Sequence, residues 1–159
     1  MDVTPATVRE ERDRLRARAD AVVPVVNAVR RDLGEAFDTT VAPIDASAYR
    51  ETIDAVFADG DRAVNVAGLS MLLRVLDVAD DYPGFVVDEL LGRELAAMIA
   101  GEQPLRLLAE ATFHYADATA VADTPGSAGL DDLDAALAAG VQTRLPGWDW
   151  READNPFEG

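Results

Sequence analysis

Residues 63–79 read AVNVAGLSMLLRVLDVA, and only Arg74 and Asp77 among them carry a charge. At 3.6 residues per turn these two side chains share one narrow stripe with Ser70, and Asp81 would extend that stripe. Nearly all of the remaining helix surface is apolar or small. A helix that is hydrophobic over most of its circumference is a buried one. We therefore expect residues 63–79 to form a central helix around which the other helices pack.

Helical spacing and turn residues divide the remaining chain into further helices. The expected helices span residues 5–37, 48–58, 63–79, 85–100, 104–122 and 131–140. The first would begin with Thr4 as its N-cap and be kinked or divided near Val23, because Pro24 removes a backbone hydrogen bond inside it. The predicted fold class is all-α, a single-domain bundle of about five to six helices with a long, kinked N-terminal helix. The bundle would occupy residues 1–140, followed by an irregular, aromatic-containing tail over residues 141–159.

An apolar seam runs from Val8 to Phe37 at alternating steps of three and four residues, interrupted only by Arg12. The other predicted helices are shorter than this seam, so they could not cover its full length. An apolar seam without a partner in its own chain is usually covered by another subunit. The predicted interface comprises Leu15, Ala19, Val22, Val26, Val29 and Leu33.

The tail holds both tryptophans of the chain, Trp148 and Trp150, and Phe157 follows them. Exposing large aromatic side chains costs free energy, so we expect these residues to dock onto another surface. That surface is either the chain's own bundle or the groove of a protein partner, where aromatic residues are common anchors. Trp148 and Trp150 therefore join the candidate interface residues.

The chain is strongly acidic, with 30 Asp and Glu against 14 basic residues and a formal net charge of −16. All basic residues are arginine, and Asp outnumbers Glu by 20 to 10. This composition resembles that of cytosolic proteins from extreme halophiles, in which molar salt shortens the Debye length to roughly 3 Å and screens self-repulsion. The N-terminus has no apolar signal-peptide core, and no apolar run could cross a bilayer, so we expect a cytoplasmic protein without a membrane partner.

Composition and motifs also exclude several chemistries. The absence of cysteine excludes disulfide frameworks, thiolate metal sites and cysteine nucleophiles. With His114 as the only histidine, a three-histidine zinc site within one chain is excluded. Glycine-rich phosphate loops, zinc-protease motifs and esterase nucleophile elbows do not occur. We therefore predict no cofactor from these patterns.

One helix face could nevertheless hold a metal ion. Glu110, His114 and Asp117 share a stripe and would offer two carboxylates and an imidazole to Mg²⁺ or Mn²⁺. Asp77 and Asp81 on the facing helix could complete the site, as in a small metal-dependent phosphohydrolase. The simpler interpretation is a solvated, salt-linked face of an amphipathic helix, and a proton-sensing histidine is a third.

Residues 1–31 carry seven arginines against five acidic residues. A basic helix can bind nucleic-acid phosphates, but several of these arginines lie at pairing distance from acids, which makes nucleic-acid binding the weaker alternative. The favoured interpretation is a non-enzymatic helical protein–protein interaction module that self-associates through residues 8–37. The metal-dependent phosphohydrolase is its main alternative.

Overall fold

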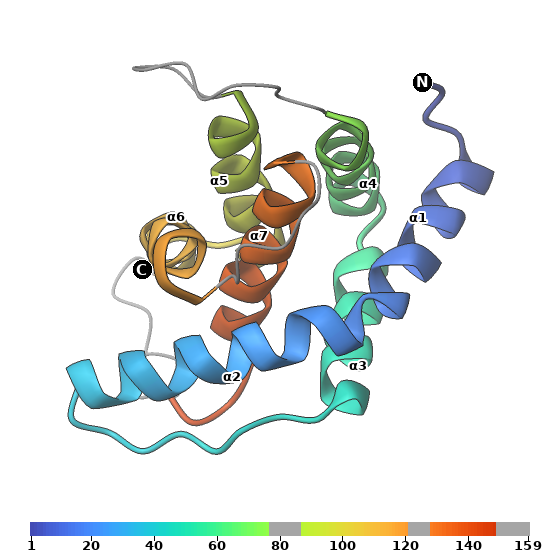
Figure 1. Cartoon of the computed structure of the whole chain (residues 1–159). Helices are drawn as coiled ribbons and strands as arrows, with labels where there is room; N and C mark the ends of the chain where they lie inside the picture. The colour runs from blue at the N-terminus through green and yellow to red at the C-terminus, as the bar shows by residue number, and fades with distance from the viewer. Residues whose placement is uncertain (77–86, 121–127, 149–159) are drawn as a thin grey trace.

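The computed structural model describes residues 1–76, 87–120 and 128–148, and every regular element in these residues is helical (Figure 1). The predicted all-α bundle is confirmed. Its elements are α1 (Pro5–Ala17), α2 (Ala19–Ala36), α3 (Ala46–Phe57), α4 (Gly60–Val75), α5 (Val87–Ala100), α6 (Leu105–Tyr115), the short π-helix η1 (Ala116–Ala120) and α7 (Ala128–Arg144).

The centre of the bundle is α7, not residues 63–79. Helix α7 runs between α2 on one side and α5 and α6 on the other, and residues 135–143 are buried without a break (Figure 1). Its side chains are mostly small there, which lets several helices approach it closely. A Cβ on Gly140 would lie only 2.7 Å from the Cβ of Ile99 on α5. An alanine-rich segment can thus form the core of a bundle.

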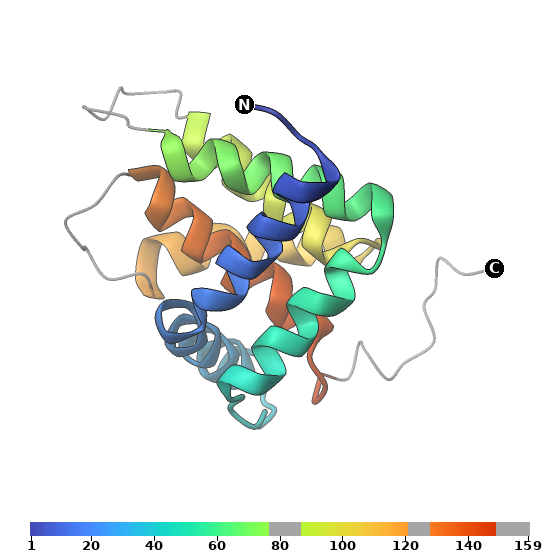
Figure 2. The ribbon, with the colours of Figure 1, turned by 90° about the vertical axis from the view of Figure 1, so that its right-hand side faces the viewer.

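Helix α4, which contains most of the apolar stretch, lies at the edge of the bundle (Figure 2). Its inner side is buried through Val66, Ala67 and Leu73. Its outer side exposes Val64 and Leu72. The prediction of a central helix was wrong because an apolar circumference indicates that a helix avoids water, but does not identify what covers it.

The N-terminal helical segment is divided at Arg18 rather than near Val23. Thr4 caps α1 as predicted, accepting a hydrogen bond from the backbone N–H of Thr7. Pro24 lies inside α2. At the break, Arg18 donates from Nε and Nη2 to the two carboxylate oxygens of Asp134 on α7, at 2.6 and 2.7 Å. This long-range pair, which sequence spacing does not reveal, ties the α1–α2 corner to the central helix.

The expected boundary after residue 140 falls inside α7, which continues to Arg144. Val141, Leu145 and Trp148 are all buried. The chain up to residue 148 therefore belongs to the bundle. The rest of the predicted tail, residues 149–159, lies outside the described residues.

Candidate functional site

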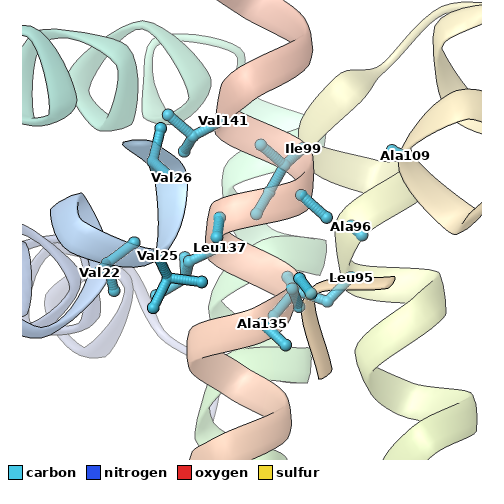
Figure 3. Close-up of a cluster of buried hydrophobic side chains, with 14 of the residues drawn as sticks. Val22, Val25, Val26, Leu95, Ala96, Ile99, Ala109, Ala135, Leu137 and Val141 are labelled. Carbon is cyan, nitrogen blue, oxygen red and sulfur yellow. The ribbon is translucent and has the colours of Figure 1, made fainter. Parts of the chain in front are cut away.

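The apolar seam of the N-terminal helices is buried within its own chain. Leu15, Ala19, Val22, Val26 and Val29 are each at most 1% exposed, and Leu33 is partly buried. Figure 3 shows Val26 beside Val141 of α7, and Val25, next to Val22, beside Leu137 of α7. The expectation that a second subunit covers this seam was wrong, because the missing partner is α7, which was predicted to span only residues 131–140.

Trp148 is fully buried on its own bundle, so it is not a free anchor for a partner. The guanidinium carbon of Arg30 lies 5.4 Å from the centre of its ring. Arg30 is itself buried and donates to the carbonyl oxygens of Ala42 and Pro146, at 3.1 and 2.9 Å. Burial lowers the pKa of Arg30. This cluster fastens the chain after α7 to α2, whereas Trp150 lies outside the described residues.

The predicted metal face does not converge. His114 Nδ1 lies 3.0 Å from a carboxylate oxygen of Glu89 on α5, and both side chains are well exposed. Within the residues described, no three His, Asp or Glu side chains are arranged to hold a metal ion. Glu110, His114 and Asp117 therefore do not form the expected constellation, and Asp77 and Asp81 lie outside the described part of the chain.

A different group of carboxylates meets where α5, η1 and α7 pack together. Asp88 and Asp132 are 2% and 5% exposed, and both interact with Asp117. Burial, followed by the charges of Asp117 and Asp88, raises the pKa of Asp132 to about 9. Burial also raises the pKa of Asp117, although its hydrogen bond with Asp132 opposes that shift. Asp132 is therefore protonated at neutral pH and is a hydrogen-bonding group rather than a charge.

No local pattern in the sequence predicts this cluster of Asp88, Asp117 and Asp132. Their proximity depends on α5 and α7 lying side by side, which no local spacing encodes.

The N-terminal arginines are largely neutralised by carboxylates. Arg16 pairs with Asp54 of α3, and Arg18 with Asp134 of α7. Arg12 and Arg31 each contact the adjacent aspartate. Arg30 is buried, as described above. The excess of positive charge counted along residues 1–31 is therefore not a continuous basic surface.

Within the described part of the polar stripe on residues 63–79, Arg74 faces α1. Arg74 donates to the fully buried carboxylate of Glu11, and Arg14 lies 3.6 Å from the same group. This ion pair between α1 and α4 directs Arg74 away from the outer side of α4.

The outer side of α4 is an exposed apolar surface, which we call the α4 face: Val64, Gly68, Leu72 and Val75. These residues follow one another at steps of four, four and three, so they share one side of the helix. Val64, Leu72 and Val75 are 47%, 39% and 74% exposed. At the start of α5, which packs beside α4, Val87 and Leu90 are exposed as well.

The two arginines of α4 are directed away from this face. Arg74 binds Glu11, and the Arg62 guanidinium lies against the backbone at Gly101 beyond the end of α5. Asp61, in the first turn, is the one charged residue of α4 on the exposed side. In a chain of net charge −16, this leaves an unusually neutral strip of surface.

Two hollows on the described surface were considered as possible catalytic sites. One of about 580 Å³ between α1 and α3 is lined by Arg16, Asp54 and Phe57, and its arginine and aspartate are already paired. Another, of about 380 Å³, lies between α2 and the segment that follows it and is lined by Arg30, Thr39 and Val41. The second hollow also contains Glu35, but among the described residues no hydrogen bond joins its carboxylate to Thr39 or Thr40. Neither hollow therefore shows the hydrogen-bonded nucleophile and base of nucleophilic catalysis.

Comparison with known protein families identifies the family of this chain. The family described as "Domain of unknown function (DUF7984)" matches residues 1–159. The chain belongs to this family. The match to DUF7984 covers every helix of the bundle and the residues after α7. No curated protein and no solved structure matches the chain. None of the helices in the described residues is both long and apolar enough to cross a membrane.

Proposed function

We propose that this protein is a non-enzymatic helical interaction module that docks a protein partner on the α4 face. The observation that carries the proposal is the exposure of Val64, Leu72 and Val75 on one side of a helix that bears no charge between Arg62 and Arg74. Contiguous exposed apolar surface is costly, and where it persists it commonly marks an interaction site.

The contrast with the rest of the chain strengthens the proposal. Charged residues make up 28% of the sequence, yet none occurs at positions 63–73. The core has no need for apolar residues at the three exposed positions, because the inner side of α4 already packs on the bundle. Polar residues at these positions would leave the packing unchanged and remove the cost of exposing hydrocarbon.

We further propose that the module acts in a cytoplasm of molar salt, for which its acidic, lysine-free composition suits it. High salt screens the repulsion between this chain and acidic partners. It also strengthens apolar association when the salt is excluded from protein surfaces. An apolar docking face is therefore better suited to such conditions than one built from ion pairs.

Site-specific photocrosslinking in cells that produce the protein naturally tests the proposal. A photoreactive amino acid is placed at Leu72 of the full chain, and a matched chain carries it at Leu107. Leu107 is the control because it is 61% exposed but lies on α6, away from the α4 face.

We expect a discrete protein adduct from position 72 and none from position 107. The absence of an adduct at position 72, or equal labelling from both positions, would contradict docking on the α4 face. Circular dichroism of each purified variant verifies that the helical content is unchanged.

A further inference from the structure

We draw no further inference here: the strongest candidate, the exposed apolar outer side of α4 that we call the α4 face, is the docking surface already proposed, and nothing in the described part of the structure shows what covers it.

Discussion

Replacing Gly140 with alanine probes the closest approach in the core. The new Cβ would lie 2.7 Å from Ile99 Cβ, 2.8 Å from Ile99 Cγ2 and 3.0 Å from the carbonyl oxygen of Ala96. Carbon atoms pack at about 3.5 to 4.0 Å, so α5 and α7 would have to separate by roughly 1 Å. A backbone oxygen and the branched carbon of isoleucine cannot move aside by a simple change of rotamer.

Two opposing terms determine the expected change in stability. Overpacking a core costs about 1–3 kcal/mol, whereas replacing glycine with alanine inside a helix stabilises it by up to about 1 kcal/mol. Because the neighbouring atoms are rigid, we expect the packing term near its upper limit. Gly140→Ala should then lower the free energy of unfolding by about 2 kcal/mol.

Gly68→Ala is the matched control, because it makes the same chemical change on a helix where the new methyl group meets nothing within 4 Å. It should raise stability by up to about 1 kcal/mol through helix propensity alone. Subtracting the two effects removes the propensity term and leaves the cost of close packing between α5 and α7.

Thermal unfolding followed by circular dichroism in molar KCl, at low protein concentration, measures both variants. A change of 1 kcal/mol shifts the Tm of a domain of this size by about 2–4 °C. We expect Gly140→Ala to lower the Tm by about 4–8 °C and Gly68→Ala to raise it by about 2–4 °C. A Gly140→Ala protein as stable as the natural one would refute the close approach of α5 and α7.

Three further substitutions test other contacts. Because the pKa of Asp132 is raised to about 9 in the fold, its ionisation in the unfolded chain removes stability progressively from about pH 4 to pH 9. Asp132→Asn should therefore gain stability over the natural chain across that range, and a pH-independent difference in urea midpoints would contradict the assignment. Glu11→Ala leaves Arg74 unpaired and should lower the free energy of unfolding by about 3–5 kcal/mol. The control Glu10→Ala, at an exposed neighbouring position, should lower it by less than about 0.5 kcal/mol. Urea unfolding measures both variants. Trp148→Ala should lower the free energy of unfolding by about 3–5 kcal/mol. An unchanged Tm of this variant would show that Trp148 does not stabilise the bundle.

The all-α class could be predicted because it depends on local patterns. Thr4 before Pro5 marks a helix start, and apolar residues at three- and four-residue steps mark helix faces. These rules act within a few turns of the chain. They do not determine which faces meet, which is why Val22 and Val26 were recognised as a seam but assigned to the wrong partner.

The candidate site was predicted poorly for the same reason. His114 and Glu110 share a helix face, but the partner of His114 is Glu89 on α5. Asp132 has an unusual protonation state only because α5 and η1 bury it beside two other carboxylates. The sequence identifies a polar face, whereas the partner of each polar group depends on contacts between distant segments.

The sequence by itself determined the helical class, the acidic character and the position of the longest charge-free stretch, since propensity, charge and composition are properties of single residues and their near neighbours. Tertiary structure alone decided that α7 is central and that α4 lies at the edge with its apolar outer side exposed. The physical reason is that hydrophobicity drives a helix face out of water without specifying its partner. Close packing selects that partner, and small residues such as Gly140 allow the closest approach.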